Sequence, residues 1–149
     1  MKVINGDILS PTDDVDAICI PTNLQRRMDG TAVMGAGLAL AAHKKWYLAY
    51  AYGQRLFSGA KSVVVIKTIG EDEIIHIVSV PTKVHWRDNS TVELITKSLN
   101  DLVDIADSLS LKQVWVPSLG TGLGGLSTNI VWPLMHEKLD DRFTMVLKK

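Results

Sequence analysis

The stretch "LKQVWVPSLGTGLGGLSTNIVWPLMHEKL" (residues 111–139) joins three local patterns that decide the fold class. Its first part, "LKQVWVP", is a short apolar run that ends at a proline, which is typical of a buried strand. Its last part, "STNIVWPLMHEKL", predicts a helix. Between them lie four glycines within six positions, although each glycine raises the conformational entropy lost on folding: Gly120, Gly122, Gly124 and Gly125. The sequence therefore predicts a strand, a glycine-rich turn and a helix, and a function for backbone without side chains in that turn has to be found.

Strand-like and helix-like segments alternate in the same way along the rest of the chain. Strands are predicted over residues 1–5, 15–21, 61–69, 73–81, 111–117 and 142–148, with the third and fourth paired through a turn at "GED" (70–72). Helices are predicted over residues 35–57, 91–109 and 127–139. Asn89 or Ser90 is the expected N-cap of the second helix, with Glu93 completing a capping box with Ser90. This alternation predicts an α/β fold with a mostly parallel or mixed six-stranded sheet and helices on both faces.

Length and composition restrict the class of protein. The chain has 149 residues, 46% of them hydrophobic and 21% charged, so we expect one globular domain over residues 1–149. Sixteen basic and sixteen acidic side chains cancel, which excludes the strong positive field of a protein that coats nucleic acid but leaves a local basic patch open. Cys19, the single cysteine, is expected to be an inert buried thiol, which fits a reducing compartment. No stretch approaches the ~20 apolar residues of a membrane span, so we expect a cytoplasmic protein with no membrane partner.

Two glycine turns are predicted at the carboxyl ends of strands, where open α/β sheets bind their ligands. Besides the turn at residues 117–126, "VMGAGLALA" (33–41) places Gly35 and Gly37 at the start of a predicted helix. Backbone N–H groups of both turns can converge on an anion such as a diphosphate. A dinucleotide-binding fold is rejected despite the G-x-G-x-x-G pattern of the second turn, because only one strand follows it. The alternative, that these glycines only permit a tight turn and close packing, stays open.

Five motifs in register resemble the macrodomain family, the ADP-ribose-binding three-layer α/β/α module. They are "NGDI" (5–8), "PTN" (21–23), "VMGAGLALA" (33–41), "SVPTKVHWRDNS" (79–90) and "VPSLGTGLGGL" (116–126). Within the family, "PTKVHWRDNS" and "GLGGL" are most similar to the branch of the DarG-type DNA ADP-ribosyl glycohydrolases, which is related to the terminal ADP-ribose glycohydrolase. The resemblance implies that this chain binds ADP-ribose, without a cofactor.

The resemblance also implies which residues bind ADP-ribose. Asp7 and the N–H of Ile8 would contact adenine, and Asn23 would meet the distal ribose; a turn-forming role for Asp7 and a loop or capping role for Asn23 are the alternatives. Met34, Gly35, Ala36 and Gly37 would line the diphosphate and the distal ribose, with Thr82 close by. The other phosphate wall would consist of Ser118, Leu119, Gly120, Thr121, Gly122, Leu123 and Gly124.

An enzymatic function depends on Lys83, because the resemblance implies that this lysine attacks the anomeric carbon of the distal ribose. That reaction needs a neutral amine, which desolvation or nearby cations favour, and His85 and Arg87 are candidate neighbours. In the alternative interpretation Lys83 is a solvated cation or only attracts phosphate. The terminal ADP-ribose glycohydrolase carries an acidic residue where this chain has Gly124, a glycine that the DarG-type branch shares, so a second catalytic carboxylate is missing there.

Other residues carry weaker signals. "LQRRMDGT" (24–31) brings Arg26 and Arg27 near the crevice, where they either steer a polyanion or are solvated loop charges. Trp86 either stacks on a nucleobase or anchors its loop. The four histidines show no metal-ligand spacing, so we expect no metal site.

These observations favour an ADP-ribosyl glycohydrolase that removes ADP-ribose from a modified macromolecule, with a nucleic acid such as a modified DNA base as one candidate carrier. Two alternatives are a non-catalytic ADP-ribose reader or scavenger and a hydrolase of small derivatives such as ADP-ribose 1''-phosphate.

Overall fold

A single mixed sheet forms the centre of the molecule in the computed structural model, which describes residues 1–57 and 63–149. Its six strands lie in the order β1-β6-β5-β2-β4-β3. Neighbouring strands run parallel except β3, which is antiparallel to β4. The strands are β1 (Lys2–Gly6), β2 (Ala17–Asn23), β3 (Val64–Ile69), β4 (Ile75–Lys83), β5 (Val114–Val116) and β6 (Phe143–Lys148). The predicted mixed six-stranded sheet is confirmed; Lys61 and Ser62 of the predicted third strand lie outside the described residues.

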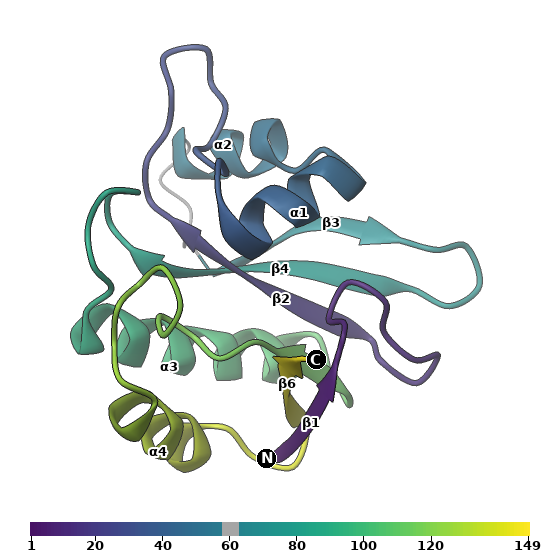
Figure 1. Ribbon diagram of the computed structural model, residues 1–149. Coiled ribbons are helices and arrows are strands. Elements are labelled where there is room, and N and C mark those ends of the chain that lie inside the picture. The colour runs from purple at the N-terminus through teal and green to yellow at the C-terminus, as the bar shows by residue number, and fades with distance from the viewer. Residues whose placement is uncertain (58–62) are drawn as a thin grey trace.

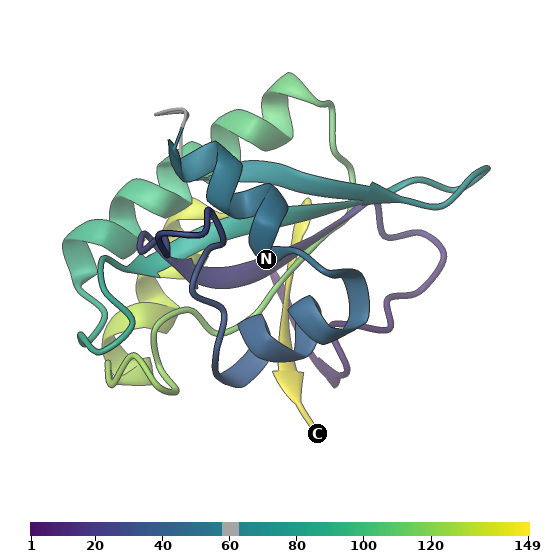
Figure 2. The same cartoon turned by 90° about the horizontal axis from the view of Figure 1, so that it is seen from above.

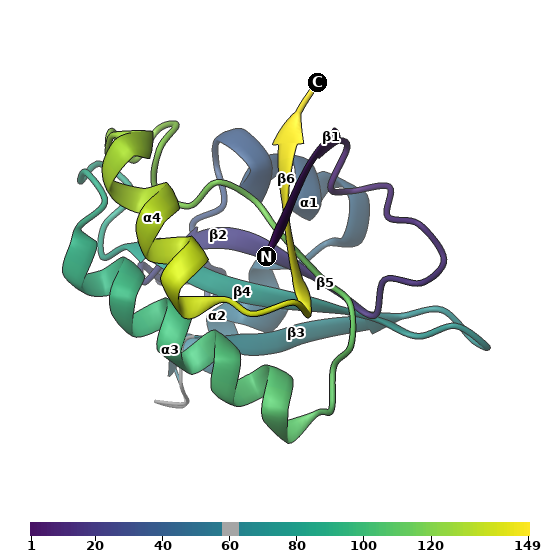
Figure 3. The same ribbon diagram turned by 90° about the horizontal axis from the view of Figure 1, so that it is seen from below.

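Helices cover both faces of the sheet, so the molecule has three layers (Figure 1). α1 (Gly37–Trp46) and α2 (Ala49–Phe57) lie on one face, which Figure 2 shows from above. α3 (Val92–Ser108) and α4 (Thr128–Lys138) lie on the other, as Figure 3 shows from below. Successive residues of β2 serve the two layers in turn: Ala17 and Cys19 pack into the cluster under α3 and α4, and Ile18 and Ile20 into the cluster under α1 and α2.

The prediction of one helix over residues 35–57 is wrong, because the helix breaks at Tyr47. Tyr47 has φ 58°, a left-handed conformation, and its N–H donates to the carbonyl of His43, which ends α1. His43 Nδ1 then accepts a hydrogen bond of 3.1 Å from the N–H of Ala49 and so begins α2. Leu48, between the helices, is fully buried. The molecule therefore has two short helices where the sequence predicted a single long one.

The predicted cap of the second helix is also wrong. The N-cap of α3 is Thr91, whose hydroxyl accepts a hydrogen bond of 3.2 Å from the N–H of Leu94. Neither Asn89 nor Ser90 caps this helix, and the capping box of Ser90 with Glu93 does not form, because Thr91 takes the N-cap position. The Ser90 hydroxyl is buried without a hydrogen-bond partner in the described structure, and the Ser90 N–H donates to the carbonyl of Gly124, 2.9 Å away. Ser90 thus supports the second glycine turn.

β2 and β4 both continue two residues past the prolines where they were predicted to end. Pro21 pairs with Val80 and Thr22 with Pro81, and the strands reach Asn23 and Lys83. Proline removes one hydrogen-bond donor, but its fixed φ is compatible with extended backbone at the end of a strand. The extension places Asn23 and Lys83 on rigid strand ends.

Candidate functional site

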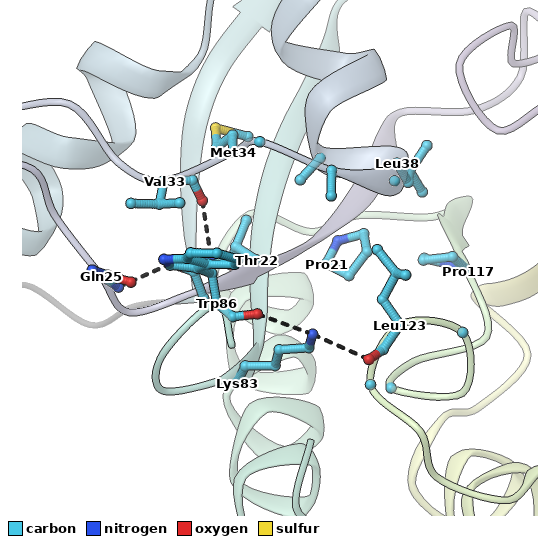
Figure 4. Close-up of a pocket in the computed structure, with 18 of the residues that line it drawn as sticks. Pro21, Thr22, Gln25, Val33, Met34, Leu38, Lys83, Trp86, Pro117 and Leu123 are labelled. Carbon is cyan, nitrogen blue, oxygen red and sulfur yellow. Dashed lines mark hydrogen bonds between the residues drawn. The ribbon is translucent and has the colours of Figure 1, made fainter. Parts of the chain in front are cut away.

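A cavity of about 720 Å³ opens at the carboxyl ends of β2, β4 and β5. These three strands are neighbours and parallel, so the segments that follow them meet at one edge of the sheet. Both glycine turns line this cavity, as predicted (Figure 4). The lining consists of Pro21, Thr22, Asn23, Gln25, Arg27, Val33, Met34, Gly35, Ala36, Gly37, Leu38, Ala39, Lys83, Trp86, Pro117, Ser118, Gly120, Gly122, Leu123 and Gly124.

Lys83, the last residue of β4, presents its amine at the wall of this cavity. The Nζ atom donates to two main-chain carbonyl oxygens, that of Leu123 at 3.2 Å and that of Trp86 at 3.4 Å (Figure 4). The first contact joins β4 to the second glycine turn, and the second joins it to the segment that follows β4. The amine therefore has a defined position without an acidic partner among the cavity's described residues.

Asn23 ends β2 beside Lys83 and ties this strand to the first glycine turn. Its Nδ2 donates to the carbonyl of Val33 at 2.9 Å, and its Oδ1 accepts from the N–H of Gln25 at 2.9 Å. The side chain therefore has a loop-organising role. Because each amide atom keeps capacity for a further hydrogen bond, this role is compatible with the predicted contact to a ribose.

The glycines of the two turns fall into two groups. A Cβ at Gly120 would lie 2.5 Å from Ile95 Cδ1, and a Cβ at Gly124 would collide with Ser90 Oγ and the carbonyl of Gly120. These two positions need glycine for packing. A Cβ at Gly35 or Gly122 would meet no atom of the described chain within 4 Å. The fold does not require bare backbone at Gly35 and Gly122, and both face the cavity.

Side chains from beyond the turns fix their conformation. Trp132 of α4 donates from its indole nitrogen to Ser118 Oγ at 2.7 Å, and Ser118 Oγ also bonds the hydroxyl of Thr121. Leu123 approaches the first turn, since its Cδ1 would lie 3.3 Å from a Cβ at Gly37, where φ is +56°. The two turns are thus neighbours across the cavity.

Five predicted site residues do not line this cavity. Ile8, Thr82 and Leu119 are buried. The hydroxyl of Thr121 is used within its own turn. Asp7 follows the carboxyl end of β1, and its Oδ1 accepts from the N–H of Leu9 at 3.0 Å, the turn-forming role considered for it above. Contacts of these residues with a ligand stay predictions.

Arg27 and Trp86, which the sequence left with two alternatives each, both line the cavity. Arg27 belongs to an arm over residues 24–33, whose two sides bridge at Arg26 and Ala32. The arm packs on α2: the N–H of Ala32 donates to the carbonyl of Ala49 at 2.8 Å, and the Arg26 guanidinium lies 4.4 Å from the centre of the Phe57 ring. The arm therefore holds Arg27 in the cavity wall. The sequence signal was the stretch 24–31, which follows Asn23 and was expected to bring Arg26 and Arg27 near the crevice.

Cys19 and Asp29 are among the titratable groups outside the cavity whose pKa values are shifted. Cys19 is fully buried, as predicted, and burial raises the pKa of its thiol. Hydrogen bonds from Thr31 lower the pKa of Asp29 at the tip of the arm. Within residues 1–57 and 63–149 no group of three or more His, Cys, Asp or Glu side chains could hold a metal ion. None of the helices in these ranges has the length and apolarity that a membrane crossing requires.

Comparison with known proteins gives relatives for nearly the whole chain. A "DNA ADP-ribosyl glycohydrolase" of Mycobacterium tuberculosis is 31% identical over 143 residues, which are 93% of this chain. This chain spans only 37% of that relative's length. The solved macrodomain of Thermus aquaticus DarG superposes with a TM-score of 0.78 at 26% identity, covering 99% of this chain and 97% of the other. Thermosipho africanus DarTG in complex with ADP-ribose gives a TM-score of 0.75 at 26% identity, covering 98% of this chain and 41% of the other.

The family model for the Macro domain matches residues 30–135, a range that contains the first glycine turn, Lys83 and the second glycine turn. These matches confirm the resemblance to macrodomains that the five sequence motifs indicated. They also confirm the greater similarity to the DarG-type branch. With the three-layer fold and the cavity between the two turns, they establish that this chain belongs to the macrodomain family.

Proposed function

We propose that this protein binds ADP-ribose in the cavity at the ends of β2, β4 and β5 and hydrolyses the bond that joins the distal ribose to a macromolecule. The observation that carries the proposal is the Lys83 amine, held by two main-chain carbonyls in the wall of a cavity whose two open glycines face it. The solved complex of Thermosipho africanus DarTG with ADP-ribose supports the choice of ligand.

The diphosphate would lie between the two glycine turns. Main-chain N–H groups at Gly35 and Gly122 can approach phosphate oxygens closely because no side chain intervenes. Arg27 adds a positive charge to the same wall. The distal ribose would then lie toward Asn23 and Lys83. Adenine would extend toward Asp7 and Ile8, which follow β1 at the same edge of the parallel part of the sheet.

Lys83 would act as the nucleophile. A neutral primary amine has two N–H bonds and one lone pair, and the two carbonyls of Trp86 and Leu123 match those two N–H bonds. The lone pair would form a bond to C1'' of the distal ribose while the bond from C1'' to the carrier breaks. The carrier keeps that electron pair and takes a proton from solvent, and the nitrogen gives up one proton. Water then adds to C1'', the nitrogen recovers its electron pair and a proton, and free ADP-ribose leaves.

A non-catalytic reader is the second candidate, and the cavity's composition favours it. No carboxylate lines this cavity within the described residues, so its own lining supplies no carboxyl group as general acid or base. An acidic side chain at position 124 would collide with Ser90 and Gly120, so packing itself excludes the missing carboxylate.

DNA is the carrier we favour, because the Mycobacterium tuberculosis relative is named as a DNA ADP-ribosyl glycohydrolase. A cytoplasmic location stays a prediction that rests on the lone thiol of Cys19.

Calorimetry with ADP-ribose, followed by an assay of ADP-ribose release from a modified oligonucleotide, tests the proposal. We expect Lys83→Ala to abolish release while ADP-ribose still binds. Lys112→Ala is the matched control, since this exposed lysine precedes β5 at the opposite edge of the sheet. Full activity of Lys83→Ala would refute the lysine mechanism. If the unaltered protein binds ADP-ribose but releases none from modified DNA, modified protein or small esters, the protein is a non-catalytic reader.

A further inference from the structure

A second, shallower cavity of about 360 Å³ adjoins the first. The two cavities share Ala36, Lys83, Trp86 and Leu123 in their walls. The second is completed by Arg87, Asp88 and Asn89, which follow Trp86 directly in the chain and do not line the first. Three of the four shared residues are thus Lys83 and the two whose carbonyls hold its amine, Trp86 and Leu123.

We propose that this second cavity holds the nucleobase that carries the ADP-ribose, as the leaving-group site of the reaction. The inference rests on the proposed function, because it takes ADP-ribose to occupy the first cavity. In a displacement at C1'' the leaving atom lies across that carbon from the entering nitrogen. The leaving group must therefore lie next to the distal ribose, beyond C1'' as seen from the Lys83 amine, and the second cavity is the space that adjoins the ribose end of the first.

The turn that builds the second cavity has a fixed shape. His85 Nδ1 accepts from the N–H of Arg87 at 3.1 Å, and the carbonyl of His85 accepts from the N–H of Asp88 at 3.0 Å. The carbonyl of Trp86 holds the Lys83 amine from the same turn. Asn89 lies against the second glycine turn, where its Oδ1 would be 3.3 Å from a Cβ at Gly125. The cavity is therefore formed before a ligand arrives.

The side chains of this cavity suit a planar heterocycle. Trp86 is 46% exposed and Leu123 67% exposed, so both offer apolar surface to a ligand. Aromatic rings and guanidinium groups bind unstacked bases by stacking. The Arg87 guanidinium lies over the Trp86 ring, 4.7 Å from its centre, and the His85 ring stacks near the same indole with centroids 5.9 Å apart. These three flat groups form a stack that a base can extend from the exposed side of Arg87 or of the indole.

Two exposed side chains can read the edge of such a base. Asn89 presents one amide donor and one acceptor, and the carboxylate of Asp88 accepts from a ring N–H or an exocyclic amine. The set of one aromatic ring, one guanidinium, one amide and one carboxylate therefore favours a nucleobase over a protein carrier.

Binding measurements on the non-cleaving Lys83→Ala protein test this site. The ligands are ADP-ribose, a single-stranded oligonucleotide with ADP-ribose on one base, the same oligonucleotide unmodified, and an ADP-ribosylated peptide, all at one salt concentration. We expect the modified oligonucleotide to bind about tenfold more tightly than ADP-ribose. Asn89→Ala and Asp88→Asn should each reduce this ratio and leave the affinity for ADP-ribose unchanged. Asn100→Ala and Asp104→Asn, exposed positions on α3 that line neither cavity, are the matched controls.

Each outcome has a distinct meaning. If ADP-ribose itself does not bind, the proposed function fails. If ADP-ribose binds but the modified oligonucleotide binds no more tightly, or both substitutions leave the ratio unchanged, the leaving-group site is refuted. An equal gain with the modified peptide overturns the assignment to a nucleobase, and an equal affinity for the unmodified oligonucleotide shows that the gain does not come from the linked base.

Discussion

Asn23 and Lys83 are register partners at the carboxyl ends of β2 and β4, directly after an irregularity between Thr22 and Asn23. Asn23 holds the first glycine turn through the carbonyl of Val33, and Lys83 holds the second through the carbonyl of Leu123. Two adjacent residues of the sheet therefore position both walls of the cavity. Small changes at either residue should alter ligand binding more than they alter the core.

Asn23→Ala is expected to weaken ADP-ribose binding about tenfold and to lower the free energy of unfolding by about 1–2 kcal/mol, because two hydrogen bonds to the backbone are lost. Calorimetry and denaturant unfolding measure the two effects. Asn100→Ala, an exposed asparagine of α3, is the control. Unchanged affinity for ADP-ribose would show that the first turn keeps its position without Asn23.

Lys83→Arg distinguishes a nucleophile from a cation that only attracts phosphate. Arginine keeps the positive charge but is always protonated and cannot attack C1''. We expect ADP-ribose to bind Lys83→Arg and its release from a modified oligonucleotide to fall to the rate without enzyme. Retained release by this variant would favour a purely electrostatic role.

Gly35→Ala and Gly122→Ala should leave stability nearly unchanged and reduce ADP-ribose affinity about tenfold, because a methyl group there meets only the ligand. Gly124→Ala is the contrasting variant and should destabilise the fold by about 1–3 kcal/mol through its collision with Ser90 and Gly120. Denaturant unfolding and calorimetry on all three variants give the comparison. Wild-type affinity in both Gly35→Ala and Gly122→Ala would mean that no phosphate approaches these amides.

Tyr52 makes stability sensitive to alkaline pH. Its hydroxyl donates to the carbonyl of Asn23 and accepts from Thr22, and burial raises its pKa. Above about pH 10 the unfolded chain loses this proton before the folded protein does, so the free energy of unfolding falls as pH rises. Unfolding of wild type and Tyr52→Phe between about pH 8 and about pH 11 tests this, with a shallower slope expected for the variant.

Cys19→Ala controls for the buried thiol, whose raised pKa acts in the same direction and begins at a lower pH, near the ordinary value of about 8.5. Identical slopes in wild type and Tyr52→Phe, once Cys19 is replaced in both, would contradict the assignment to Tyr52.

The sheet and the meeting of the two turns could be predicted because they depend on hydrophobic periodicity and on glycine position, which are local properties of the sequence. The break at Tyr47 could not, since "KWYLAY" (45–50) contains neither glycine nor proline and the left-handed residue is stabilised by His43 and the burial of Leu48. Tertiary packing overrode helix propensity there.

Side-chain partners across the fold were equally out of reach of the sequence. Ser90 has the spacing of a cap, but its contact with Gly124 comes from a segment 34 residues further along the chain. Likewise, Arg27 enters the cavity wall because the arm rests on α2. Such roles depend on contacts that only the assembled fold provides.

The two glycine turns come from residues 33–41 and 117–126 and meet only when the central strands are in place. A molecule gripped by both would act as a tether between the early and late parts of the chain, and binding would add to the energy needed for unfolding by mass action. Resistance to heat and to proteases should therefore rise with the concentration of any true ligand. Melting experiments could rank candidate nucleotides before a reaction is ever assayed.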